Sequence, residues 1–179
     1  MPCSLEVMLG DITQLSVDAI VNAANSGLAG GGGVDGAIHR AAGYERLQEA
    51  CGKLGGCPTG QVKVTEGFNL PVKYIFHAVG PIWQGGSHNE MNLLASCYRN
   101  VMKLAGELKV RSLAFPAISC GVYGFPMDKA VAIAVTEVNR ALQELQELQE
   151  TGAMERVIFC CFDRPMAKCY DAELARLNG

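Results

Sequence analysis

The sequence predicts an α/β fold in which helices cover a mostly parallel central sheet. Short apolar runs alternate along the chain with longer stretches of helical periodicity, an order typical of layered α/β domains. Several apolar runs are continuous rather than alternating, which indicates strands that are covered on both faces. Two glycine-rich segments follow apolar runs and precede predicted helices, as expected for loops at the carboxyl edge of a parallel sheet.

The elements follow from these patterns. Apolar runs predict strands at 5–9, 19–21, 74–79, 112–117 and 157–162. Residues 61–65 alternate and are rich in β-branched side chains, so this strand is expected nearer a sheet edge. Helical patterns cover 34–51, 90–108, 128–149 and 165–177, and the Leu-Gln-Glu repeat within 141–150 is interpreted as a solvated helix end. Because no linker interrupts the pattern, residues 1–179 are expected to form a single domain.

The composition excludes several classes of protein. Of the 179 residues, 49% are hydrophobic and 18% are charged, which is too apolar for a disordered chain. The net charge is −3 and no run of Lys or Arg reaches four, so we expect no broad nucleic-acid surface. No apolar stretch is long enough for a membrane span, and residues 1–6 lack the features of a secretion signal. We therefore expect a cytoplasmic protein without membrane contact.

The eight cysteines and three histidines offer no convincing metal site. No C-x-x-C pair is present, and several cysteines lie in apolar runs such as 158–161. Reduced thiols are the expectation for a cytoplasmic chain. The sequence thus predicts neither a metal nor a cofactor.

The first glycine-rich segment, residues 22–40, can form a phosphate-binding loop. Glycines 30–33 place no side chains between the backbone and an anion, and the following helix start adds a favourable dipole. Gly31, Gly33 and Gly36 also fit the dinucleotide fingerprint G-x-G-x-x-G. A dehydrogenase would need an acidic residue about twenty positions later at the end of a second strand, whereas here the chain continues as a helix.

The second glycine-rich segment, residues 115–126, is built in the same way. Two such loops at neighbouring strand ends would form a crevice and could hold a diphosphate from both sides. Neither loop contains a lysine, so backbone N–H groups are expected to bind the phosphates.

Several motifs together resemble the macrodomain family over nearly the whole chain. They are GDIT at 10–13, DAIVNAAN at 18–25, GGGGVDGAIHRAAG at 30–43, CPTG at 57–60, HAVGP at 77–81, FPAIS at 115–119 and GVYG at 121–124. The resemblance is closest to the bacterial branch that hydrolyses O-acetyl-ADP-ribose and mono-ADP-ribosyl esters. Cys120 departs from the threonine expected in that branch. The resemblance implies a three-layer α/β/α fold with a mixed six-stranded sheet.

The resemblance also implies roles for individual residues. Asp11 would accept a hydrogen bond from the adenine amino group, and Ile12 would touch the adenine. Phe162 would pack against the adenine, although an ordinary core position is an equally good interpretation. The residues expected around the diphosphate are Gly32, Gly33, Val34, Ser119, Cys120, Gly121, Val122 and Tyr123.

Asn25, Asp35 and His39 are the predicted catalytic residues. Asp35 would act as a base or would orient the water that attacks an ester on the distal ribose; its alternative role is a helix-start acid. Asn25 would orient the ribose or the water. His39 follows Asp35 by one helical turn and would either tune the site or merely pack. His77 ends a buried strand and is expected to be structural, and no cysteine is expected to be a nucleophile.

The expected ligands are ADP-ribose, O-acetyl-ADP-ribose and mono-ADP-ribosylated proteins. Two other functions use the same features: a reader that binds ADP-ribose without turnover, and a generic nucleotide or RNA-end binding module. The combination of Asn25 and Asp35 with the four glycines favours the hydrolase.

Overall fold

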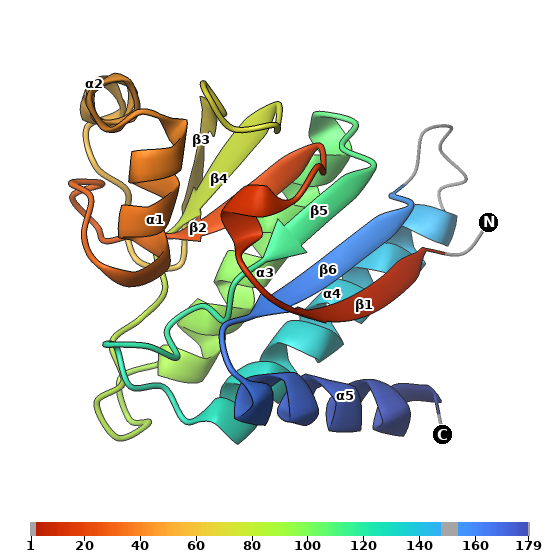
Figure 1. Cartoon of the computed structure of the whole chain (residues 1–179). Coiled ribbons are helices and arrows are strands. Elements are labelled where there is room, and N and C mark those ends of the chain that lie inside the picture. Colours follow the sequence, from red (N-terminus) through yellow and green to blue (C-terminus); the bar gives the residue numbers. More distant parts are fainter. Residues whose placement is uncertain (1–2, 148–153, 179) are drawn as a thin grey trace.

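The computed structural model describes residues 3–147 and 154–178, and within these ranges six strands form one sheet (Figure 1). The strands are β1 (Ser4–Leu9), β2 (Ala19–Ala23), β3 (Val62–Glu66), β4 (Tyr74–Ala78), β5 (Ser112–Phe115) and β6 (Arg156–Cys161). Their order across the sheet is β1-β6-β5-β2-β4-β3. All neighbours are parallel except β3, which runs antiparallel to β4 at the edge. The mixed, mostly parallel sheet and the edge position of the 61–65 strand are therefore confirmed.

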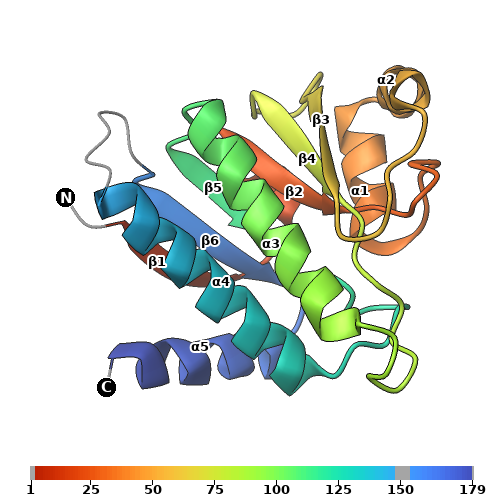
Figure 2. The same ribbon diagram turned by 180° about the vertical axis from the view of Figure 1, so that it is seen from behind.

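Helices cover both faces of the sheet. They are α1 (Gly33–Ala42), α2 (Tyr44–Leu54), α3 (Glu90–Glu107), α4 (Met127–Glu147) and α5 (Arg164–Asn178), with a short 3-10 helix, η1 (Ile12–Gln14). Figures 1 and 2 show α1 and α2 on one face and α3 and α4 on the other. The helix α5 packs beside α4 and shares the core on that side.

Alternating residues of the strands supply two separate cores. On β2, Ala19 and Val21 pack into the core under α3, α4 and α5, whereas Ile20 packs into the core under α1 and α2. On β4, Phe76 packs into the core under α3, α4 and α5, and Ile75 packs into the core under α1 and α2. This period of two in strands that are covered on both faces confirms the predicted three-layer α/β/α fold.

One predicted helix is wrong in its extent. The segment 34–51 was expected to be a single helix, but α1 ends at Ala42 and α2 begins at Tyr44. Gly43 separates them with a φ of 104°, a conformation that residues other than glycine rarely adopt, and its N–H still bonds to the His39 carbonyl. The break turns α2 toward β3. The predicted helix at 128–149 is observed to Glu147, and 148–149 lie outside the described residues.

Among the described residues, none of the helices combines the length and the apolar character that a bilayer crossing requires.

Candidate active site

Both glycine-rich loops begin at the carboxyl edge of the sheet. The strands β2 and β5 are parallel neighbours, with Ala19 opposite Leu113, so the segments that follow Ala23 and Phe115 emerge side by side. The segment after β4 joins them, because a side chain at Gly80 would collide with Ser119 and Ile118. The predicted meeting of two loops at this edge is what the structure shows.

The first loop is held in shape by Asn25. Its Nδ2 donates to the Gly30 carbonyl at 3.0 Å, and its Oδ1 accepts from the Ala29 N–H at 3.0 Å. Each of these polar atoms can still form one further hydrogen bond. Asn25 therefore stabilises the loop and remains able to contact a ligand.

The four glycines leave the start of α1 uncovered. A side chain at Gly32 or Gly33 would meet nothing within 4 Å, and Gly33 has a φ of 57°. Gly32 is the N-cap of α1 and has no side chain with which to cap it. The N–H groups of the first turn, which include those of Val34 and Asp35, have no acceptor within the helix and suit an anion.

The second loop offers a matching set of donors. Ser119 has a φ of 67°, and its carbonyl accepts from the Phe125 N–H at 3.0 Å, which closes the loop. Within the described part of the chain, the N–H groups of Gly121, Val122 and Tyr123 have no hydrogen-bond acceptor. Consecutive free N–H groups of this kind form an anion-binding surface.

Cys120 leaves these backbone donors in place. Burial raises the pKa of the Cys120 thiol to about 12, so the thiol stays uncharged and does not repel a phosphate. The departure from threonine therefore changes a side chain without adding charge to the loop.

Asp35 is a buried carboxylate with one oxygen held and one oxygen free. Its Oδ1 accepts from Asn22 Nδ2 at 2.8 Å and lies 3.0 Å from His39 Nδ1. Its Oδ2 faces Gly31, where an added side chain would come within 3.5 Å of it, and the same position lies 3.8 Å from Asn25 Nδ2. The free oxygen of Asp35 and the Asn25 amide thus flank the bare backbone of the glycine loop.

His39 contacts Asp35 directly. Burial opposes protonation of the ring, but its hydrogen bonds with Asp35 outweigh this and raise the pKa of His39. The contact with Gln48 opposes protonation of the His39 ring. Its Nε2 donates to the Leu28 carbonyl and lies 2.7 Å from His39 Nε2, where the ring must accept. The ring therefore carries its proton on Nδ1, which lies 2.9 Å from the Asp35 carbonyl oxygen and 3.0 Å from Asp35 Oδ1.

The sequence analysis did not predict the chain of buried polar contacts behind Asp35. Asn22, fully buried on β2, donates from Nδ2 to Asp35 and also lies 3.1 Å from His77 Nδ1. His77 Nε2 lies 2.9 Å from the Thr65 hydroxyl. Burial lowers the pKa of His77 to about 4, so the ring is neutral and accepts from Asn22 while donating to Thr65. Strand periodicity could have indicated Asn22, because it shares the face of Ile20, which packs toward α1.

The residues predicted to bind adenine lie after the neighbouring strands β1 and β6. Asp11 is exposed, and its Oδ1 accepts from the Thr13 N–H at 2.9 Å and from the Thr13 hydroxyl at 2.7 Å, which leaves Oδ2 free. Phe162 is 66% exposed just beyond β6, so of its two interpretations the core position is wrong. The Ile12 side chain, by contrast, is buried in the core on the α1 side.

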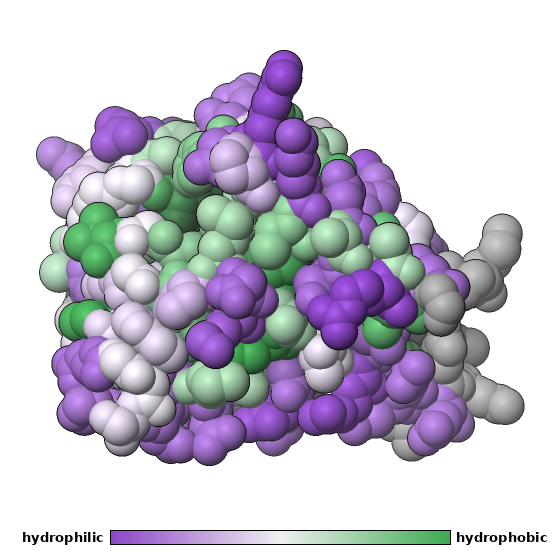
Figure 3. All heavy atoms as spheres, turned by 90° about the horizontal axis from the view of Figure 1, so that it is seen from below, coloured by the Kyte–Doolittle hydropathy of each residue, from purple (hydrophilic) through white to green (hydrophobic). Residues whose placement is uncertain are grey.

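Exposed apolar surface accompanies these residues. Val122 is fully exposed, and Phe162 and Leu9 are also among the large apolar side chains that remain on the surface. Figure 3 shows apolar side chains in the middle of the face seen from below, interrupted there by groups of polar side chains.

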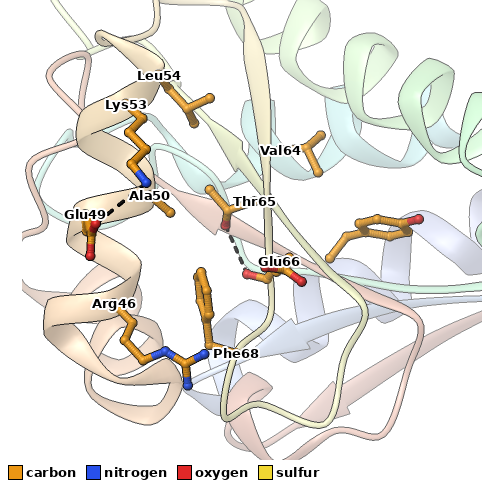
Figure 4. A pocket seen from close by; sticks show the side chains of 10 residues that line it. Arg46, Glu49, Ala50, Lys53, Leu54, Val64, Thr65, Glu66 and Phe68 are labelled. Carbon is orange, nitrogen blue, oxygen red and sulfur yellow. Dashed lines mark hydrogen bonds and ion pairs between the residues drawn. The ribbon is translucent and has the colours of Figure 1, made fainter.

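Two of the surface cavities formed by the described residues differ in position. A cavity of about 270 Å³ borders both loops, through Ser26 and Tyr123. A larger one, of about 540 Å³, lies between α2 and the β3–β4 pair, near Tyr74 at the amino end of β4 (Figure 4). In the larger cavity, Lys53 is paired with Glu49 at 3.6 Å, and Arg46 lies over Phe68. Its position away from the carboxyl edge makes it a poor candidate for the chemistry, despite its size.

Comparisons with known proteins agree with this description. The model of the family described as Macro domain matches residues 21–134. A macro domain-containing protein of Chlorobaculum tepidum is 54% identical over 171 residues, which cover 96% of this chain and 95% of the relative. One from Ralstonia nicotianae is 54% identical over 172 residues, which cover 96% and 94%. The fold therefore belongs to the class of α/β domains with two glycine-rich loops at the carboxyl edge of the sheet. The chain belongs to the Macro domain family.

Solved structures place the chain among the macrodomains as well. The Oceanobacillus iheyensis macrodomain with MES bound has a TM-score of 0.90 and 42% identity, over 98% of this chain and 93% of that one. The Trypanosoma brucei macrodomain in complex with ADP-ribose has a TM-score of 0.85 and 40% identity, over 95% of this chain and 68% of that one. The family resemblance drawn from the sequence motifs is therefore confirmed.

Proposed function

We propose that residues 1–179 act as one macrodomain that binds ADP-ribose in the crevice at the carboxyl edge and hydrolyses an ester bond on the distal ribose. The single observation that carries the proposal is the geometry of Asp35. It is a buried carboxylate whose Oδ1 is fixed by two side chains and whose Oδ2 faces the glycine loop. The cytoplasm is the expected compartment.

The order of the strands supports the proposed orientation of the ligand. Asp11 and Phe162 follow β1 and β6, the second loop follows β5, and the first loop with Asp35 follows β2. Adenine, diphosphate and distal ribose would then lie in this order along the edge. The Trypanosoma brucei macrodomain in complex with ADP-ribose and the Oceanobacillus iheyensis macrodomain with ADP favour this kind of ligand.

The chemistry requires only a positioned water. Water, oriented by Asp35 Oδ2, adds to the ester carbonyl carbon; the bond between that carbon and the ribose oxygen then breaks. The ribose oxygen leaves as a hydroxyl, and the acyl group is released as a carboxylic acid. Asn25 would orient the ribose or the water, and contacts with His39 and Asn22 hold Asp35 in position. Phosphate oxygens of the substrate would share the proton transfer.

Turnover of two substrates tests the proposal. O-acetyl-ADP-ribose should yield acetate, and a peptide ester-linked to ADP-ribose through a glutamate should yield free ADP-ribose. Both reactions should proceed in EDTA, because the residues hold no metal in this mechanism. Loss of turnover in EDTA that one divalent ion restores would contradict the metal-free mechanism.

Binding measurements separate the two alternative functions. A protein that binds ADP-ribose and releases no product from either ester would be a reader. One that binds AMP or a short RNA as tightly as ADP-ribose would be a generic nucleotide module.

A further inference from the structure

We infer that the 270 Å³ cavity beside the two loops binds the peptide residue whose side chain carries the ADP-ribosyl ester. This inference rests on the proposed function and extends it, because it assigns a site to the part of the substrate that is not ADP-ribose. It favours ester-linked peptides over O-acetyl-ADP-ribose as the substrate that fills the whole site.

The sheet topology places this cavity next in line after the distal ribose. The strands at the carboxyl edge follow the order β1, β6, β5, β2, β4, and the proposed ligand occupies the edge from β1 to β2. The cavity is lined by Val79, Gly80 and Pro81, which directly follow β4. A substituent on the distal ribose that continues along the edge would therefore enter it.

The cavity shares its walls with the candidate active site. Ser26 follows Asn25 in the first loop, and Tyr123 belongs to the second loop; both line the cavity. The Trp83 N–H donates to the Tyr123 carbonyl at 2.8 Å, so the segment after β4 and the second loop are joined. Gly80 lies so close to Ser119 that a side chain there would collide.

The chemistry of the lining suits an uncharged peptide segment. Thr59 and Ser26 offer hydroxyls and Gln84 an amide, while Leu93 and Ile82 supply apolar surface. The one carboxylate, that of Glu90, already accepts three backbone hydrogen bonds. An esterified glutamate has no charge, so the ionised Glu90, whose oxygens are already bonded to backbone N–H groups, would not repel it.

The size of the cavity distinguishes the substrates. The cavity has a volume of about 270 Å³, many times the roughly 10–15 Å³ of such volume that a single water needs. An acetyl group has only three non-hydrogen atoms, whereas a glutamyl residue in a peptide is about three times larger. The acetyl ester would leave most of this volume to water.

The test fills the cavity from two sides. Thr59→Trp and Gln84→Trp each add a large side chain at an exposed lining position, and Thr136→Trp, on an exposed position of α4, is the matched control. In both lining variants, kcat/KM for a glutamate-linked ADP-ribosyl peptide should fall at least about tenfold, as is typical when a side-chain subsite is lost. For O-acetyl-ADP-ribose, kcat/KM should stay within about twofold.

A binding measurement keeps the inference testable without turnover. The wild type should bind a non-hydrolysable, amide-linked ADP-ribosyl peptide more tightly than ADP-ribose, and the two lining variants should lose this preference while still binding ADP-ribose. Equal losses for both esters, or an unchanged preference for the peptide conjugate, would overturn the inference. A wild type that prefers the conjugate yet cleaves neither ester would instead refute only the proposed hydrolysis.

Discussion

Asp35 and Glu90 are both buried carboxylates in the first turn of a helix, and both helices follow a strand at the carboxyl edge of the sheet. Their oxygens have different partners. Glu90 Oε2 accepts from the Gln84 and Gly86 N–H groups at 2.8 Å, and Oε1 accepts from the His88 N–H at 2.6 Å. Asp35 has both of its side-chain contacts on Oδ1.

This difference separates a carboxylate whose oxygens are all bonded within the fold from one that we propose acts on a ligand. Burial alone would raise the pKa of Glu90, but hydrogen bonds from three backbone N–H groups lower it to about 2. The carboxylate is therefore ionised and stabilises the 84–88 loop through these bonds. Asp35 keeps Oδ2 for a ligand or a water. Asp11 follows the Asp35 pattern, because Thr13 occupies only its Oδ1. Free lone pairs, rather than burial, mark the carboxylates that can act on a substrate.

The largest expected effect is on turnover. Asp35→Ala should slow hydrolysis of O-acetyl-ADP-ribose roughly 10²–10⁴-fold, the usual contribution of general base assistance. The affinity for ADP-ribose should change much less, because other residues are proposed to contact adenine and diphosphate. Asn25→Ala should also reduce turnover strongly. Steady-state kinetics and calorimetry on the folded variants give both quantities.

The control for Asp35 is another helix-start acid. Glu45 lies in the first turn of α2 and is exposed, so Glu45→Ala should retain wild-type turnover. If Asp35→Ala also retained wild-type turnover, Asp35 would be only a helix-start acid. Its free oxygen would then have no role in catalysis, in contradiction to the difference drawn between Asp35 and Glu90.

The second effect is on affinity. Asp11→Ala should weaken ADP-ribose binding about ten- to a hundredfold, since a hydrogen bond to a charged group contributes roughly 1.5–3 kcal/mol. Thr13→Val, which removes the hydroxyl bonded to Oδ1 and leaves Oδ2 free, should weaken binding less. Calorimetry that shows unchanged affinity in Asp11→Ala would remove the adenine assignment.

The third effect concerns the group that holds Asp35. Asn22→Asp conserves volume but places a second carboxylate against Asp35 Oδ1, with His39 and His77 as the other titratable groups facing the pair. Two carboxylates in contact share a proton, so the acid limb of the pH–rate profile should move to higher pH. The exposed Asn92→Asp is the matched control for an added charge. An unshifted profile in Asn22→Asp would mean that Asn22 does not position the reacting carboxylate.

The sequence was sufficient for the features that depend on local patterns. Apolar runs located the strands, and glycines between strand and helix located both loops. The break at Gly43 was missed because helical periodicity continues through it, although its positive φ required glycine. The contact between Asn22 and His77 could not be predicted from local patterns. The two residues are 55 positions apart and meet only because β2 pairs with β4. The exposure of Phe162 likewise depended on β6 ending one residue earlier than expected.

The smallest effect that we predict is on stability, in Glu90→Gln. The folded pKa of Glu90, about 2, lies below its ordinary value of 4.5, so the ionised carboxylate stabilises the fold above pH 4.5. This contribution is lost as the pH falls from 4.5 toward 2. The amide of the variant cannot accept all three N–H groups, so at pH 7 its urea midpoint should lie below that of the wild type. The difference between the two midpoints should shrink as the pH is lowered toward 2, because only the wild type loses a charge there. A difference that stayed constant from pH 7 to pH 2 would show that the three N–H groups do not depend on the carboxylate charge, and Glu90 would no longer contrast with Asp35.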